Sequence, residues 1–302
     1  MTTSRRAPAR AYAILLGAQL AVGAAAIFAR YALTGAQPLA VSALRLLVAS
    51  GILFGIACLR TRERHALTKP ENILLLFAGL ALALHFAGWI WSLQFTSVAI
   101  ATLLVCSSPI WTAVYDFVIL RRSLSRLAWV GFSCGAVGLV LVLNSHSNRV
   151  PVPGHSYAGY LLALGGSVAI GAYLILVREV RSQLSTRSII TRTYGYAAVT
   201  LTVGALLTHQ GAPNVTNTSA WLGILAMALL SQLLGHTSLN ISLHFFSPSA
   251  ISFSTLLEPV IAAILAAIVF HETLDVLALL GGCVVLASIG IVLYAEADWA
   301  RN

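Results

Sequence analysis

Residues 231–273 read SQLLGHTSLNISLHFFSPSAISFSTLLEPVIAAILAAIVFHET and contain two apolar runs, each long enough to cross a bilayer. Both runs carry polar groups where lipid disfavours them. In the first run, Gln232, His236 and Asn240 recur every four residues and would form one polar stripe on a helix. In the second, Glu258 and Pro259 sit near the middle of an aliphatic segment. An ionisable residue at that depth indicates a functional site, because burying it is costly.

The composition of the whole chain is that of a membrane protein. Hydrophobic residues make up 59% of the 302 residues and charged residues only 9%, with a mean hydropathy of +0.89. A soluble domain would have about a quarter of its residues charged. The net charge of +9 does not indicate a nucleic-acid partner, because the Arg and Lys residues lie in short loops between apolar runs. The four cysteines form no CxxC pair, which predicts packing residues and neither a disulfide framework nor a metal site.

Ten apolar runs of transmembrane length follow one another, so we expect an all-α integral membrane protein in a lipid bilayer. With a cytoplasmic N-terminus, nearly all Lys and Arg residues fall in cytoplasmic loops, and the opposite side holds only Arg30 and Arg149. This asymmetry predicts that the N- and C-termini are both cytoplasmic. The predicted runs cover residues 11–33, 38–59, 72–94, 98–120, 127–144, 157–180, 188–207, 220–243, 249–270 and 276–295.

The two halves of the chain are similar to each other. A shift of 150 positions pairs Pro109 with Pro259, and a shift of 148 aligns residues 12–30 with residues 160–178. Because each unit holds five helices, an odd number, the second copy enters the membrane inverted. Many secondary transporters are built from such inverted repeats and place their substrate site near the midplane between the halves. We therefore expect ten transmembrane helices in two inverted five-helix repeats, residues 1–147 and residues 148–302.

The two repeats, the Glu258–Pro259 pair and the following FHETL at 270–274 resemble the drug/metabolite transporter superfamily, and within it the EamA-type permeases. The resemblance covers essentially the whole chain. It implies export of small organic solutes across the bacterial cytoplasmic (inner) membrane, because bacterial amino-acid exporters, including aromatic-amino-acid exporters, are among the similar proteins. One position departs from a symmetric pattern, since the first-half counterpart of Glu258 is Ser108. A mechanism that needs matching acidic groups in both halves is therefore disfavoured.

The polar stripe at 232–240 has two interpretations. Such residues can hydrogen-bond helices together, or they can line a cavity, and their common register favours the cavity. The corresponding run at 72–94 carries His85 and Trp89 on one face, where the histidine is either structural or part of a pocket for flat, apolar side chains. Tyr194 and Tyr196 are predicted to be interfacial or packing aromatics. The candidate substrate-binding residues are His85, Trp89, Ser92, Gln232, His236, Asn240, Tyr173, Ser252 and Gln19.

Four further residues are candidates for coupling or gating. Pro109 and Pro259 lie within apolar runs, where proline removes a backbone hydrogen bond. They could be plain packing kinks, or they could supply bending points and free carbonyls around a site. Glu258 could carry a proton, which makes a proton the candidate coupling ion, or it could pair with an internal cation such as Arg45.

The sequence shows no motif of an enzyme or of ATP-driven transport, since GxxxxGK[ST] and HExxH are both missing. We therefore expect neither catalysis nor a cofactor. The leading prediction is a secondary transporter that exports neutral or aromatic amino acids, or related metabolites, by alternating access. The first alternative is a sugar-phosphate or nucleotide-sugar antiporter, which needs several inward cations for phosphate, whereas only Arg45 and Arg192 qualify. The second is a non-transporting membrane scaffold.

Overall fold

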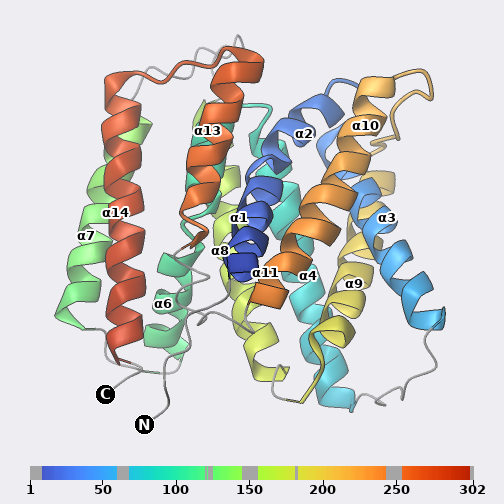
Figure 1. The fold of residues 1–302 in the computed structure, drawn as a ribbon, viewed down its shortest axis with the longest axis horizontal. Helices are drawn as coiled ribbons and strands as arrows, with labels where there is room; N and C mark the ends of the chain where they lie inside the picture. The colour runs from blue at the N-terminus through green and yellow to red at the C-terminus, as the bar shows by residue number, and fades with distance from the viewer. Residues whose placement is uncertain are drawn as a thin grey trace.

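The computed structural model describes residues 9–59, 68–119, 121, 125–144, 156–180, 183–242 and 254–299, and every regular element within these ranges is helical. The helical segments group into ten spans (Figure 1). Five stretches of the described chain are long and apolar enough to cross a membrane unaided, and shorter apolar helices account for further spans. The prediction of an all-α integral membrane protein with ten transmembrane helices in two inverted five-helix repeats is confirmed.

Several of the spans are built from more than one helical segment. The first half contains α1 (Ala9–Gly23) and α2 (Ala25–Ala32) in its first span, then α3 (Pro38–Leu59), α4 (Lys69–Ser92), α5 (Val98–Val105) with α6 (Ser108–Ile119), and α7 (Arg126–Leu143). The second half contains α8 (Ser156–Val180), α9 (Thr186–Leu207), a three-part span of α10 (Thr218–Ala226), η1 (Met227–His236) and α11 (Thr237–Ser242), then α13 (Leu257–Phe270) and α14 (Val276–Trp299).

Polar side chains in the connections determine where helices begin. Thr68 starts α4 with a capping box, in which its hydroxyl accepts from the backbone N–H of Glu71 while the Glu71 carboxylate accepts from the N–H of Thr68. Ser97 accepts from the N–H of Ile100 at the start of α5. Asp275 accepts from a backbone N–H at the start of α14, at 2.7 Å. These caps satisfy backbone donors that the apolar spans themselves cannot satisfy.

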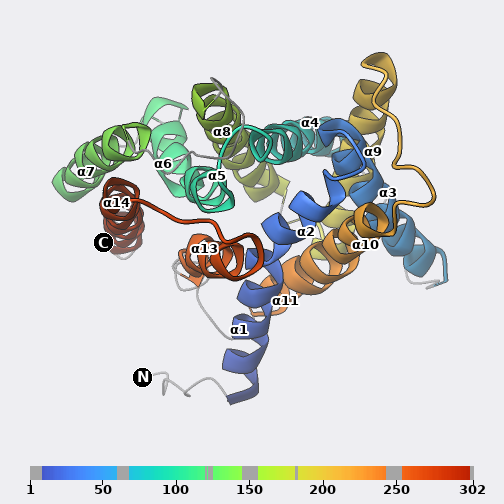
Figure 2. The same cartoon turned by 90° about the horizontal axis from the view of Figure 1, so that it is seen from above.

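The helices pack at backbone distance where glycines face a neighbour. Along α4 and α8, a Cβ added at Gly88 would lie 2.7 Å from the carbonyl oxygen of Leu162. Along α7 and α14, a Cβ at Gly138 would lie 3.0 Å from the carbonyl oxygen of Gly281. Seen from above, α7 and α14 stand together at one end of the molecule and α3 and α9 at the other, with α5, α13 and α1 between them (Figure 2). Small residues thus permit the close helix contacts that membrane bundles rely on.

Two hydrogen bonds, one partly buried and one buried, join equivalent spans of the two repeats to the opposite half. In one, Gln19 of α1 donates to the Ser254 hydroxyl at 2.7 Å, which joins the first span to the ninth. In the other, the Ser167 hydroxyl of α8 lies 3.0 Å from the Ser107 hydroxyl, which joins the sixth span to the fourth. Gln19 and Ser167 are counterparts under the 148-residue shift. Equivalent spans of the two repeats therefore make equivalent contacts with the opposite half.

Pro109 and Pro259 lie within the predicted apolar runs, but neither of them bends a continuous helix. The fourth span is broken after α5, at Cys106 and Ser107, and Pro109 is the second residue of α6. Pro259 is the third residue of α13. A proline in the first turn of a helix has no intrahelical N–H bond to lose. Each proline begins a helical segment, and the span of Pro109 is a broken helix of the kind that surrounds binding sites in transporters.

Candidate functional site

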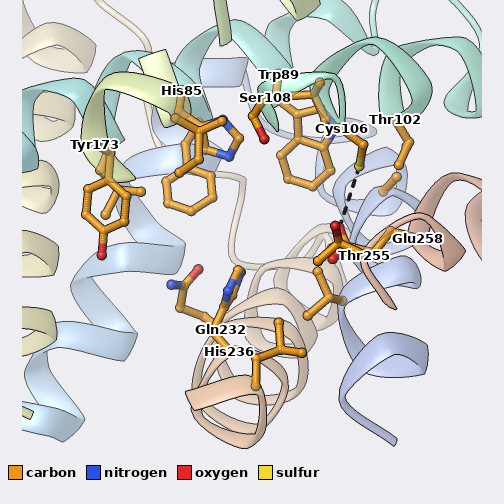
Figure 3. A pocket seen from close by; sticks show the side chains of 18 of the residues that line it. His85, Trp89, Thr102, Cys106, Ser108, Tyr173, Gln232, His236, Thr255 and Glu258 are labelled. Atoms are coloured by element: carbon orange, nitrogen blue, oxygen red, sulfur yellow. Dashed lines mark hydrogen bonds between the residues drawn. The ribbon is translucent and has the colours of Figure 1, made fainter. Parts of the chain in front are cut away.

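A cavity of about 250 Å³ lies deep in the bundle, between helices of both halves (Figure 3). Seven of the ten spans contribute polar or aromatic side chains to its wall. From the first half these include Arg45 of α3, His85, Phe86 and Trp89 of α4, and Cys106 after α5. From the second half they include Tyr173 of α8, Tyr194 of α9, Gln232 and His236 of η1, and Glu258 of α13.

The polar stripe predicted from the sequence reaches the cavity through an unusual backbone. Segment η1 is π-helical, with i→i+5 hydrogen bonds that place more residues in a turn than the 3.6 of an α-helix. Residues four apart still share a face, so Gln232 and His236 both line the cavity, opposite His85 and Trp89 in Figure 3. The side chain of Asn240 and the whole of Ser252 lie outside the described residues. π-Helical turns are frequent at functional sites.

His85 and Trp89 form the opposite wall. The Nδ1 atom of His85 lies 3.0 Å from the carbonyl oxygen of Gly166 in α8. Because a carbonyl can only accept, Nδ1 carries the proton in the neutral ring and Nε2 is left as an acceptor. The Trp89 ring stacks over the imidazole, with ring centroids 6.5 Å apart and planes inclined by 10°. One residue thus offers the cavity an acceptor and the other a flat apolar surface.

Arg45 is the most deeply placed cation of the site, with 1% of its surface exposed. Its Nη2 donates to the side-chain oxygen of Gln232. Its guanidinium carbon lies 4.1 Å from the centroid of the Phe86 ring and 5.8 Å from that of Trp89. The hypothesis that Arg45 neutralises Glu258 is wrong for this structure, since both side chains are described and form no ion pair. The aromatic faces, in place of a carboxylate, stabilise the cation.

Glu258 lines another part of the cavity, where its carboxylate accepts from the Cys106 thiol at 3.7 Å (Figure 3). A thiol is a weak donor, so this contact leaves the carboxylate able to exchange partners. The cysteines are predicted to be packing residues, and Cys106 does pack against the hydrophobic core, but it also lines the cavity, which the sequence analysis did not predict. The signal that could have identified it is its position at the break that precedes Pro109.

Several predicted site residues lie elsewhere. Ser92 ends α4, and its hydroxyl donates to the carbonyl oxygen of Trp89 at 2.6 Å. The side-chain nitrogen of Gln19 donates to the Ser254 hydroxyl. Neither residue lines the cavity. Pro109 and Pro259 start helices beside the cavity without lining it. Tyr194 was predicted to be an interfacial or packing aromatic, and it is buried in the hydrophobic core, where it also contributes to the cavity wall. Tyr173 lines the cavity as predicted.

A second polar cluster ties the two halves together at the end of the bundle where α2 and α13 end (Figure 1). Arg30 forms an ion pair with Glu272 at 3.1 Å and donates to the carbonyl oxygen of Thr96 at 3.0 Å. Glu272 accepts from the backbone N–H of Val98, at the start of α5, at 3.0 Å. Burial raises the pKa of the Glu272 carboxyl above its ordinary value, and the opposing influence of Arg30 is smaller. We call these four residues the Arg30–Glu272 clasp.

The arrangement matches a known family over most of its length. The EamA-like transporter family model matches residues 9–144 and again residues 157–294, once for each half. The chain belongs to the EamA-like transporter family, within the drug/metabolite transporter superfamily. It is therefore a multi-pass membrane transporter of small solutes, in keeping with a central cavity lined from both repeats.

Two individual comparisons give a similar transporter and a similar fold. An uncharacterized transporter of Bacillus subtilis (strain 168), YyaM, is 24% identical over 262 residues, which cover 84% of each chain. A protein crystal structure is similar in fold with a TM-score of 0.62 and 15% sequence identity, and the match covers 97% of this chain and 99% of that one. The structural likeness concerns the fold alone at this level of identity.

Proposed function

We propose that this transporter exports neutral or aromatic amino acids, or closely related metabolites, across the bacterial cytoplasmic membrane by alternating access. In this proposal the termini are cytoplasmic, as the distribution of Lys and Arg predicts. The observation that carries the proposal is the cavity itself, which is contributed by both repeats and is mostly aromatic and aliphatic with a few polar side chains. The domain division at residues 147 and 148 belongs to the same proposal, with one repeat moving against the other.

The size of the cavity supports a small solute. Its volume of about 250 Å³ lies just below the roughly 300–1,000 Å³ of pockets for drug-sized ligands. Phe86, Trp89, Tyr173 and Tyr194 supply flat surfaces on more than one side. An amino acid with an apolar or aromatic side chain fits such a space, whereas a nucleotide sugar requires a larger one.

The charge of the cavity disfavours a phosphate ester. Among the described residues that line the cavity, Arg45 is the only Lys or Arg. Arg192, the second candidate from the sequence, donates to the hydroxyl and the carbonyl oxygen of Ser188 on its own helix and does not line the cavity. A doubly charged phosphate would need more than one cation to replace its hydration. A scaffold protein would have no reason to gather polar side chains at the repeat interface.

A proton is the proposed coupling ion. Among the described cavity residues, Glu258 is the only Asp or Glu, and no described Lys, Arg or His forms an ion pair that would hold it permanently ionised. It can therefore gain and lose a proton as the cavity changes its exposure.

The test is uptake into proteoliposomes reconstituted with the purified chain, with and without an imposed pH gradient. The panel holds labelled phenylalanine, tryptophan, leucine, glucose 6-phosphate and a nucleotide sugar, and empty liposomes provide the background. We expect the amino acids to enter above background and the phosphate compounds not to. Exchange of the phosphate compounds without amino-acid uptake would contradict the proposal.

A further inference from the structure

Arg45 is a buried cation whose hydrogen-bonding capacity is only partly used. Of its guanidinium groups, Nη2 donates to Gln232, but the buried Nε and Nη1 atoms have no hydrogen-bond partner among the described residues. A buried polar group without a partner is costly, and a buried charge without a counter-ion more so. Such a group in the wall of a cavity indicates that a ligand satisfies it.

The surroundings of Arg45 indicate the charge and the chemical group of that ligand. In the part of the chain that the structure describes, the titratable side chains that neighbour the guanidinium are His85, His236 and Tyr194, and none of them is a carboxylate. The Phe86 and Trp89 rings cover its faces, so its unused N–H groups can be reached only along its edge. A planar anion such as a carboxylate matches the edge of a guanidinium.

We infer that Arg45, held in place by Gln232, binds the carboxylate of the transported solute, so that the substrates are monocarboxylates with an apolar or aromatic body. The single cation balances one negative charge, and the same aromatic rings that cover the guanidinium offer a surface to the body of the solute. The inference rests on the proposed function for the statement that the ligand is the transported solute.

The first test compares two ligands of one shape on the purified protein. Phenylpropionate carries a carboxylate and phenylpropionamide carries a neutral amide in its place, and quenching of tryptophan fluorescence reports binding of either. The wild-type protein should prefer the acid by about ten-fold or more, the effect of a charge-assisted hydrogen bond. Equal affinity for acid and amide, or no binding of either at millimolar concentration, would overturn the inference.

Variants then locate the preference. Arg45→Gln should lose the preference for the acid, and Arg45→Lys should keep part of it, because a lysine retains the charge but loses the planar edge. Arg192→Gln is the matched control, since Arg192 is bonded to its own helix outside the cavity. A preference that survives in Arg45→Gln would overturn the assignment.

One further variant guards against a misfolded Arg45→Gln protein. Gln232→Glu keeps the shape of the side chain and places a carboxylate on the atom that already accepts from Arg45. If Arg45 awaits an anion, this internal carboxylate should raise the thermal stability and remove the preference for phenylpropionate. Raised stability with an unchanged preference would show that Arg45 is structural.

Two additional experiments distinguish a solute carboxylate site from a general anion site, and distinguish failure of this inference from failure of the proposed function. Displacement of phenylpropionate by chloride as readily as by phenylalanine would show a general anion site and overturn the reading of a solute carboxylate. Preference for the acid without transport of phenylalanine in proteoliposomes would preserve the carboxylate site and remove the proposed amino-acid export. Transport of phenylalanine without any preference for the acid would preserve the proposed amino-acid export and remove the carboxylate site.

Discussion

Gln232 and His236 lie one turn apart on η1, and both line the cavity, but they have different neighbours. Gln232 accepts from Arg45, while His236 faces the wall formed by His85 and Trp89 (Figure 3). Among the described side chains that line the cavity, all except Arg45 and Glu258 are neutral or aromatic. At the scale of single residues, the site therefore combines a soft apolar surface with a small number of charged groups that could recognise and couple a solute.

His236→Ala and Trp89→Ala should lower the rate of transport about ten-fold each, since each removes a contact with the solute of a size typical for one hydrogen bond or one aromatic surface. Uptake in proteoliposomes, normalised to the amount of folded protein, measures the effect. Trp129→Ala is the control, because Trp129 lies on α7 with 52% of its surface exposed. Equal losses in all three variants, or loss of folded protein with activity, would assign the two residues a structural role.

Glu258→Gln should remove the dependence of transport on pH while leaving solute binding in place, because the amide cannot take up a proton but keeps the size of the carboxyl. Initial uptake rates across a pH series, for wild type and variant, provide the measurement. Glu179→Gln, which changes an exposed carboxyl on α8 outside both the cavity and the Arg30–Glu272 clasp, is the matched comparison. A variant with the pH profile of the wild type would exclude Glu258 from coupling.

At the scale of helices, the breaks place the functional groups. The fourth span stops at Cys106 and resumes at Ser108, and η1 widens the eighth span where it carries Gln232 and His236. Hydropathy predicted all ten spans because bilayer thickness dictates their length. It could not predict the breaks or the π-helical turn, since both depend on contacts with the opposite repeat. For the same reason the sequence could not distinguish the cavity-lining Cys106 and Tyr194 from Ser92 and Gln19, because packing sets the rotation of each helix about its axis.

The contact of α4 with α8 positions His85 and Trp89, and Gly88 makes that contact possible. Gly88→Ala should destabilise the protein by about 1–3 kcal/mol, because the added methyl group would press on the backbone of α8. Thermal unfolding in detergent gives the measurement.

Gly51→Ala is the control for Gly88→Ala, since a Cβ at Gly51 meets no atom within 4 Å. We expect it to unfold at the temperature of the wild type or slightly above it, because alanine favours the helix. If the two variants unfold at the same temperature, the close approach of α4 and α8 does not limit stability.

At the scale of the whole molecule, the Arg30–Glu272 clasp joins the two repeats at one end of the cavity. A solute that leaves through that end requires Arg30, Glu272 and the start of α5 to separate. When they do, the Glu272 carboxyl meets water and its pKa falls back toward the ordinary value. The clasped arrangement is thus favoured at low pH, and this advantage is lost as the pH rises through the raised pKa of Glu272.

Glu272→Gln should abolish the part of the pH dependence of stability that comes from the clasp, because the amide does not titrate. Thermal unfolding across a pH series measures it as the difference between wild type and variant. We expect the stability of the wild type to fall relative to the variant as the pH rises from the ordinary carboxyl pKa through the raised one. A constant difference across this range would mean that the clasp does not sense protons.

The claim on which the account depends is that the solute binds in the cavity between the repeats, and Cys106 offers a direct probe of it. The experiment uses a chain in which Cys58, Cys134 and Cys283 are replaced by serine and measures the rate at which a small thiol reagent modifies Cys106. A chain that keeps only Cys58, exposed near the end of α3, is the control. A transported solute should slow modification of Cys106 and not of Cys58, with half-protection at the concentration that half-saturates transport. An unchanged rate at Cys106 in saturating solute would place the binding site elsewhere and contradict the account.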